Sequence, residues 1–352
     1  MQRDHEVPNP RLAELVRSGR VESWHRGSLA VWQDDRLVLG TGSVHDPVYC
    51  RSAVKPLQAL PLFERGLVDR FGWGHAEIAV LVASHDGTAA HVAAVRSLLQ
   101  KAGMDEQRLG CGAHPPFDSA TRNELVRAGV RPLRVHSNCS GKHTGFLCLA
   151  RECGDDLAHY LDPHNRSQSE VQAAVAAMAG VPGPVPVGVD GCGAPTFWLP
   201  LAALARAFAR LANPFDQPPV RRAACARILD AVAAEPVLVA GEKRFCTALL
   251  RNQPCTMFAK NGAEGVYALA LGPDPERSRF PGALGIAVKV DDGAERGYQP
   301  VLADLLQHLY PHRTDLHAAL APWRVQLQRN TRDELVGEVR CAPGLDWARL
   351  LA

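Results

Sequence analysis

The apolar positions of the chain follow a strand pattern towards both ends and a helical pattern between them. Two short apolar runs, 28–32 and 36–40, flank Gln33-Asp34-Asp35 and predict a β-hairpin with a polar turn. Further strands are predicted at 255–260, 266–271 and 285–290. The middle of the chain is rich in Ala and Arg and shows helical periodicity, which returns after the last predicted strand. The predicted helices are 57–68, 91–101, 123–128, 144–153, 167–179, 201–211, 220–234 and 299–309.

These patterns predict an α/β fold of the α+β type. Strands at both ends with helices between them favour one antiparallel-rich sheet, formed by about 20–50 and 245–292, with helices on its faces. The mainly helical region at about 90–235 is expected to group partly as a lobe. Because no internal repeat or low-complexity linker divides the chain, we expect residues 1–352 to form a single domain.

Composition narrows the classes of function. The 352 residues are 46% hydrophobic, which is enough for a large core, and 39 basic side chains nearly balance 37 acidic ones. The chain therefore has no charge excess that would indicate a nucleic acid or an anionic membrane as its partner. The charged start, Met1–Glu6, is followed by no apolar segment, and no apolar run is long enough to cross a bilayer. We therefore expect a cytoplasmic protein without a signal peptide.

The first candidate for chemistry is Arg51-Ser52-Ala53-Val54-Lys55, which contains Ser-x-x-Lys just before a helix expected to begin near Pro56. Residues three apart on a helical turn share a face, so the Lys55 amine could take the proton of the Ser52 hydroxyl. Lys55 could do so near neutral pH only if burial or a neighbouring cation such as Arg51 lowered its pKa. The alternative is a capping serine with a surface lysine.

The second candidate is Ser84-His85-Asp86-Gly87, which follows the apolar run 78–83 and precedes the predicted helix 91–101. This order of segments predicts an exposed Ser84 at the end of a strand. Consecutive Ser, His and Asp residues point in different directions and cannot easily form a triad, so Ser84 would need a base from elsewhere. The alternative is a strand-to-helix cap formed by Ser84 or Asp86.

Two further segments combine thiols with other metal-binding side chains. In residues 136–145, His136 stands where a phosphate loop needs its first glycine, and His143 stands where it needs Ser or Thr, which excludes nucleotide binding. Cys139, Lys142 and His143 could instead form half of a metal site. In residues 188–195, glycines and a proline form a tight loop from which Asp190 and Cys192 project. Cys139 and Cys192 would supply two soft ligands for zinc. The alternative is a pair of buried thiols.

The ten cysteines follow no repeated spacing, so in a reducing compartment most are expected to be free and buried. Cys246 is assigned to the core unless it lines a pocket. Lys260 is the last candidate, since it lies between an apolar run and the small-residue turn Asn261-Gly262, which could direct it into a cleft; a lysine at a hairpin end is otherwise usually solvated.

Taken together, these segments resemble the asparaginases typified by the Rhizobium etli enzymes, also called asparaginase II proteins. The resemblance spans most of the chain, and its motifs are Arg20–Gly27, Arg51–Pro56, Ala83–His85, Ser137–His143, Asp190–Pro195 and Ala259–Gly262. It implies a fold like that of serine β-lactamases and glutaminases, a homodimer, and hydrolysis of the L-asparagine side-chain amide to L-aspartate and ammonia through a serine acyl-enzyme.

The resemblance also implies the site residues. It pairs Ser52 with Lys55 and Ser84 with Lys260 as two serine-lysine tandems. It implies a zinc ion held by Cys139, Lys142 and Cys192, which shapes substrate binding more than it activates water. Arg51, His143 and Asp190 match family residues near the substrate. We favour Ser52 as the nucleophile and Ser84 with Lys260 as a proton relay, although the two serines could exchange roles.

Three alternatives to an asparaginase have to be distinguished. Penicillin-recognising enzymes should show Ser-Asp-Asn and Lys-Thr-Gly, and neither tripeptide occurs here. A glutaminase is harder to distinguish, because one methylene changes affinity by only about 1–3 kcal/mol in a simple pocket. A non-catalytic zinc-binding homologue would have a degenerate site, whereas all expected catalytic positions are present together.

Overall fold

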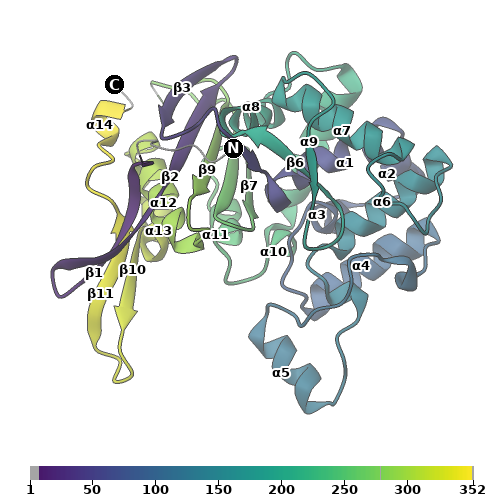
Figure 1. The fold of residues 1–352 in the computed structure, drawn as a ribbon, viewed down its shortest axis with the longest axis horizontal. Helices are drawn as coiled ribbons and strands as arrows, with labels where there is room; N and C mark the ends of the chain where they lie inside the picture. Colours follow the sequence, from purple (N-terminus) through teal and green to yellow (C-terminus); the bar gives the residue numbers. More distant parts are fainter. Residues whose placement is uncertain (1–7, 278, 351–352) are drawn as a thin grey trace.

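One antiparallel sheet, at the left of Figure 1, combines strands from both ends of the chain. The computed structural model describes residues 8–277 and 279–350, and within them the sheet has eight strands in the order β10-β11-β1-β2-β9-β8-β7, with β3 paired to β2. Its strands are β1 (Arg11–Arg17), β2 (Arg20–Gln33), β3 (Arg36–Thr41), β7 (Met257–Gly262), β8 (Val266–Leu271), β9 (Leu284–Val290), β10 (Val325–Arg329) and β11 (Leu335–Cys341).

A smaller sheet has the order β4-β6-β5 and connects the main sheet to the helical side of the molecule. Its strands are β4 (Pro47–Tyr49), β5 (Val187–Val189) and β6 (Pro195–Pro200). Two candidate segments begin at this sheet, since Cys50 and Arg51 follow β4 and Asp190 follows β5.

The helices gather mainly at the right of Figure 1, where α1 to α7 and α9 form a lobe beside the sheet. They are α1 (Lys55–Glu64), α2 (Leu67–Arg70), α3 (His75–Leu81), α4 (Ala89–Ala102), α5 (Ser119–Arg127), α6 (Ser140–Cys153), α7 (Arg166–Ala179), α8 (Leu201–Ala212), α9 (Pro219–Ala234), α10 (Pro236–Val239), α11 (Phe245–Arg251), α12 (Gln299–Leu309), α13 (Thr314–Arg324) and α14 (Trp347–Leu350). Short 3₁₀ helices cover η1 (Arg51–Val54), η2 (Glu106–Arg108), η3 (Arg134–His136) and η4 (Glu295–Gly297). None of the helices in the described part of the chain has the length and apolarity needed to cross a membrane.

The two faces of the main sheet are covered by different helices. On one face α8 approaches β9 so closely that a Cβ added to Gly285 would lie 1.8 Å from the carbonyl oxygen of Ala205. On the same face Phe208 of α8 contacts Phe258 of β7, with ring centroids 6.1 Å apart. The opposite face carries Tyr267 of β8, whose ring contacts side chains of α11 and of the segment leading into α12. The two faces therefore have separate chemical environments.

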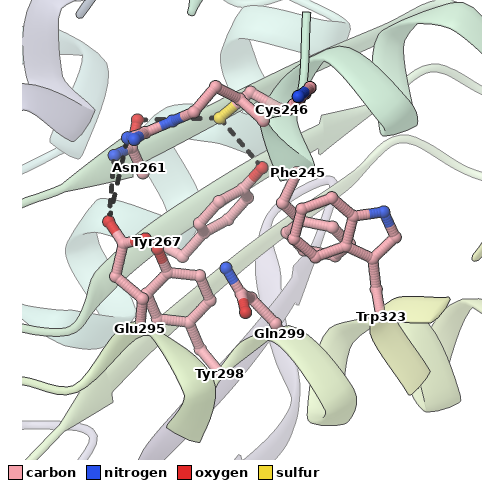
Figure 2. A pocket seen from close by; sticks show the side chains of 10 residues that line it. Phe245, Cys246, Asn261, Tyr267, Glu295, Tyr298, Gln299 and Trp323 are labelled. Atoms are coloured by element: carbon pink, nitrogen blue, oxygen red, sulfur yellow. Dashed lines mark hydrogen bonds and ion pairs between the residues drawn. The ribbon is translucent and has the colours of Figure 1, made fainter. Parts of the chain in front are cut away.

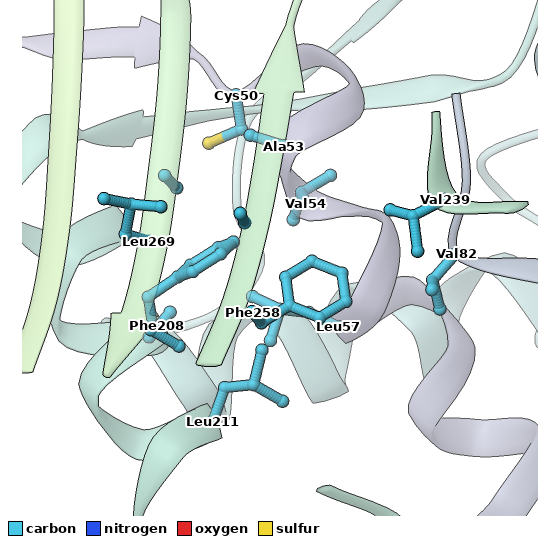
Figure 3. Packing of buried hydrophobic residues seen from close by; sticks show 14 of the residues in the cluster. Cys50, Ala53, Val54, Leu57, Val82, Phe208, Leu211, Val239, Phe258 and Leu269 are labelled. Carbon is cyan, nitrogen blue, oxygen red and sulfur yellow. The ribbon is translucent and has the colours of Figure 1, made fainter. Parts of the chain in front are cut away.

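A buried apolar cluster fixes the start of α1 against the edge strand β7 (Figure 3). Val54 and Leu57 lie in this cluster beside Phe258, while Val82 and Val239 come from the segments after α3 and at the end of α10. All five side chains are at most 1% exposed. Because close-packed side chains allow little movement, the cluster determines where the polar residues next to it, at positions 55, 84 and 260, point.

The predicted α+β fold class is confirmed, and the predicted helices are present, most with shifted ends; the helix predicted at 57–68 is divided into α1 and α2, and 299–309 matches α12. The hairpin at β2 and β3 and the strands β7, β8 and β9 are also confirmed. The sheet is larger than predicted, because β1, β10 and β11 extend it beyond the ranges 20–50 and 245–292. The strand expected before Ser84 was wrong, since residues 75–81 form α3.

Candidate active site

The Arg51–Lys55 segment forms a tight 3₁₀ turn that continues directly into α1. Arg51 has φ +49°, a left-handed value uncommon for a residue other than glycine. The end of β7 lies against this turn, because a Cβ added to Gly262 would be 3.0 Å from the carbonyl oxygen of Cys50. Ser52 is partly exposed, whereas Lys55 is only 1% exposed. The turn therefore presents a serine towards solvent and directs a lysine into the interior.

Lys55 contacts groups that the local spacing did not predict. Its Nζ donates to the carbonyl oxygen of Ala83 at 2.5 Å, to Ser84 Oγ at 2.9 Å and to the carbonyl oxygen of Asn138 at 3.3 Å. In the described part of the chain no hydrogen bond joins Lys55 to Ser52. The expected Ser52–Lys55 contact is thus replaced by a contact between Lys55 and the second serine.

Ser84 lies between two lysine side chains from opposite ends of the sequence. Lys260 Nζ donates to Ser84 Oγ at 2.8 Å, on the other side from Lys55. Ser84 is only 4% exposed, so the expectation of an exposed serine was wrong. The reason is that its loop is covered by the segment after α10, which accepts the backbone N–H of Ser84 at Val239 and that of Asp86 at Ala240.

Lys260 lies in surroundings that favour a neutral amine. Burial, together with the charge of Lys55, lowers the pKa of Lys260 to about 7. Burial also lowers the pKa of Lys55. A neutral amine can accept a proton, and a hydroxyl held between two amines can pass a proton from one to the other. The arrangement can therefore supply a general base near neutral pH.

Asn261 fixes the position of Lys260 and was not among the predicted site residues. Lys260 Nζ donates to the backbone oxygen of Asn261 at 2.8 Å and to its Oδ1 at 3.0 Å. Asn138 was also missed, although its carbonyl oxygen accepts from Lys55. Both asparagines lie inside motifs already recognised, Ser137–His143 and Ala259–Gly262, so their adjacency to a candidate residue was the available signal.

Cys139, Lys142 and Cys192 are brought together from the start of α6 and the loop after β5. Lys142 Nζ contacts Cys192 Sγ at 3.2 Å. A hydrogen bond from Cys192 and the charges of Lys55 and Lys142 hold the pKa of Cys139 well below its usual value. Gly141 permits this placement, because a Cβ there would lie 2.1 Å from the carbonyl oxygen of Val80 in α3. The predicted trio is therefore one cluster in space.

The donor set of this cluster suits a soft metal ion, since two thiols and one amine face one another. Within residues 8–277 and 279–350, no group of three or more His, Cys, Asp or Glu side chains could hold a metal ion. Burial disfavours the charged amine of Lys142, but the sulfur atoms of Cys192 and Cys139 outweigh burial and raise its pKa. A metal ion would have to displace that proton, as metal ions do with acidic ligands.

The three predicted substrate-binding residues occupy two environments. Arg51 pairs with Asp190, with both Nε and Nη2 2.9 Å from the same carboxylate oxygen. His143 is fully buried on α6, and its Nδ1 lies 2.6 Å from the hydroxyl of Tyr160. Its Nε2 is buried with no hydrogen-bond partner among the described residues. Burial and the nearby lysine charges lower the pKa of His143 well below its usual value, so its ring is neutral.

Comparison with known proteins agrees with the resemblance seen in the motifs. A family model described as L-asparaginase II matches residues 13–341, nearly the whole chain. A comparison with curated proteins found no significant match. The matched region includes every candidate residue named above, and the family implies an amidohydrolase that acts on a small amino-acid substrate. The chain therefore belongs to the L-asparaginase II family.

Proposed function

We propose that this protein is an L-asparaginase that hydrolyses the side-chain amide of L-asparagine through a serine acyl-enzyme. The observation that carries the proposal is the position of Ser84 Oγ, 2.9 Å from Lys55 Nζ and 2.8 Å from Lys260 Nζ. Two buried amines that share one hydroxyl have no evident structural purpose, because burying each amine is costly. They do provide a proton route, which amide hydrolysis needs in both directions.

Ser52 is assigned as the nucleophile and Ser84 as the relay. Ser52 is partly exposed at the turn, where a substrate can reach it, whereas Ser84 is nearly inaccessible and already bonded to both lysines. In acylation the Ser52 oxygen bonds to the amide carbon, and its proton passes to Lys55 as Lys55 gives a proton through the Ser84 hydroxyl to the neutral amine of Lys260. The relay returns a proton to the leaving nitrogen as the carbon–nitrogen bond breaks and ammonia departs. Water then attacks the ester, releasing aspartate and restoring the Ser52 hydroxyl.

Arg51, Asp190 and His143 are assigned to substrate binding. Arg51 is placed one residue before Ser52, and with Asp190 it offers one positive and one negative group. A substrate that carries both an α-carboxylate and an α-ammonium group is complementary to such a pair. Cys139, Lys142 and Cys192 would hold zinc, which would supply positive charge beside the substrate pocket. A homodimer, which rests on the resemblance alone, and a cytoplasmic location, which rests on the sequence pattern, complete the proposal.

The test compares ammonia release from L-asparagine and L-glutamine, with hydrolysis of a β-lactam measured in parallel. We expect release from asparagine, slower release from glutamine and no β-lactam hydrolysis. Release from neither amide by folded, zinc-loaded protein would overturn the proposal and favour a non-catalytic homologue.

A second measurement tests the assignment of the serines. Rapid acid quench during turnover, followed by peptide mass spectrometry, should find the acyl group on the peptide that contains Ser52. Ser52→Ala should remove the adduct. An acyl group on the Ser84 peptide would reverse the assignment.

A further inference from the structure

A pocket of about 140 Å³ lies on the face of the sheet that carries Tyr267, beside Asn261 at the end of β7 (Figure 2). Its walls are aromatic and come from four elements: Phe245 of α11, Tyr267 of β8, Tyr298 at the start of α12 and Trp323 of α13. Arg244 and Glu295 line the same pocket, so it combines apolar walls with one group of each charge.

Strand geometry places the Lys260 side chain and the pocket on opposite faces of β7, and Asn261 connects them, since it lines the pocket and its Oδ1 accepts a hydrogen bond from Lys260 Nζ at 3.0 Å. Successive side chains of a strand point to opposite faces, and in β7 Lys260 pairs with Ala268 while Asn261 pairs with Tyr267. Lys260 therefore lies on the face covered by α8, together with Phe258, whereas Asn261 and Tyr267 line the pocket. Ser84 and Lys260 are almost fully buried, so a ligand in the pocket would contact Asn261 and not these two side chains themselves.

The charged groups of the pocket have unused binding capacity. The Arg244 guanidinium lies 3.8 Å from Asp86 Oδ1 and 3.9 Å from Glu295 Oε1, both too long for hydrogen bonds. In the part of the chain that the structure describes, the Arg244 side chain makes no hydrogen bond, and Asp86 Oδ1 is buried without a partner. Glu295 accepts a long hydrogen bond of 3.5 Å from Asn261 Nδ2 and also interacts with the Tyr298 hydroxyl. A guanidinium offers five donors in a fork that matches a carboxylate, so this state is unusual.

We infer that this pocket is a binding site for a free α-amino acid, distinct from the site that holds the substrate for hydrolysis. The α-carboxylate of the ligand would bind Arg244, its α-ammonium group would bind Glu295, and its side chain would contact the aromatic walls. The α-carboxylate would then meet a guanidinium whose nearest carboxylates lie 3.8 and 3.9 Å away, and the α-ammonium group would meet a carboxylate that is half exposed. The inference does not depend on the catalytic roles of the serines.

The test uses L-leucine, which has no side-chain amide and so cannot be consumed. Titration calorimetry and tryptophan fluorescence with the full-length protein should show saturable binding, and Trp323→Phe should remove the fluorescence change. Arg244→Gln and Glu295→Gln should each weaken binding by about tenfold or more, because each removes one charged contact. Leucine amide and N-acetyl-leucine, which lack one charged end each, should bind similarly weakly. Glu295 is half exposed, so Glu295→Gln remains informative if Arg244→Gln fails to fold.

The controls distinguish this pocket from the catalytic site. Arg251→Gln, an exposed arginine paired with Glu242 near α11, and Asp190→Asn at the proposed substrate site should leave leucine affinity unchanged. Absence of saturable binding to the wild-type protein would overturn the inference. So would unchanged affinity in both Arg244→Gln and Glu295→Gln, or a loss of binding in Asp190→Asn alone.

Discussion

Lys260 and Lys142 are buried to nearly the same extent, at 0% and 4% exposure, yet their pKa values move in opposite directions. The pKa of Lys260 falls to about 7, because burial and the charge of Lys55 act together. The pKa of Lys142 rises, because the sulfur atoms of Cys192 and Cys139 outweigh burial. Burial alone therefore does not decide the protonation of a lysine; the neighbouring groups do.

The difference assigns two kinds of chemistry to two adjacent regions. The hydrogen-bond partners of Lys260 are hydroxyl and carbonyl oxygens, which leave a neutral amine available as a base. Around Cys192 the neighbours are thiols, which pair with a cation and could exchange that cation for a metal ion. Variants of the two lysine environments can therefore be compared directly.

The largest effect is expected from Lys260→Met, which keeps the length of the side chain but removes the amine. We expect kcat/KM for asparagine to fall by about 10³–10⁴-fold, as when a general base is lost. Steady-state ammonia release measures the loss, with Lys243→Met, an exposed lysine, as the matched control. A rate within tenfold of wild type would remove Lys260 from the mechanism.

A smaller effect is expected from Cys192→Ser in the other region. The variant should lose bound zinc, because one of two soft ligands is replaced by a poorer one. Metal analysis of the purified protein measures this loss, and we expect activity to fall by about 10–100-fold, as for other perturbed metal sites. Cys153→Ser, a half-buried thiol outside the cluster, should retain zinc. Full zinc retention in Cys192→Ser would contradict the ligand assignment.

The pH dependence of the reaction should follow the amine of Lys260. Below a pKa of about 7 this amine is protonated and cannot accept a proton, so kcat/KM should rise about tenfold per pH unit up to that value and then level off. Asn261→Asp places a negative charge on the group that accepts from Lys260 Nζ, which favours the charged amine. The pH range over which kcat/KM rises should therefore move to higher pH by about one unit. If the pH dependence of kcat/KM were the same in Asn261→Asp as in wild type, another group would control the rate.

Local patterns predicted the parts of the molecule that depend on neighbouring residues. Helices such as α7 and α8 could be predicted from periodicity, and the hairpin at β2 and β3 from its turn. Strand β1 pairs with β11, more than 300 residues away at Ala13 and Cys341, and no local pattern encodes such a pairing. The apolar run before Ser84 was assigned to a strand because length and apolarity alone do not separate a short strand from a buried helix.

The same limit applies to the site. Spacing predicted Lys55 beside Ser52, since the two lie three residues apart, but the amine reaches Ser84 instead, 29 positions further along the chain. The contact between Ser84 and Lys260 spans 176 positions and depends on how β7 lies against the loop after α3. Residue types and motif positions could be predicted from the sequence, whereas the partner of each lysine required the fold.

The smallest effect is expected from Asp190→Asn, which sharpens the comparison because it leaves the contacts of Lys260 intact and removes one of the charges that raise the pKa of Lys142. Asp190 holds Arg51 through two contacts, and the pair is proposed to bind the charged ends of asparagine. Removing the charge should raise KM by about tenfold and change kcat little, because binding in the ground state is lost but the proton route stays. Asp315→Asn, which breaks an exposed pair with Arg313, serves as the control and should change neither constant. If Asp190→Asn lowered kcat instead, the Arg51–Asp190 pair would act on the reacting groups, and substrate recognition would have to reside elsewhere in the site.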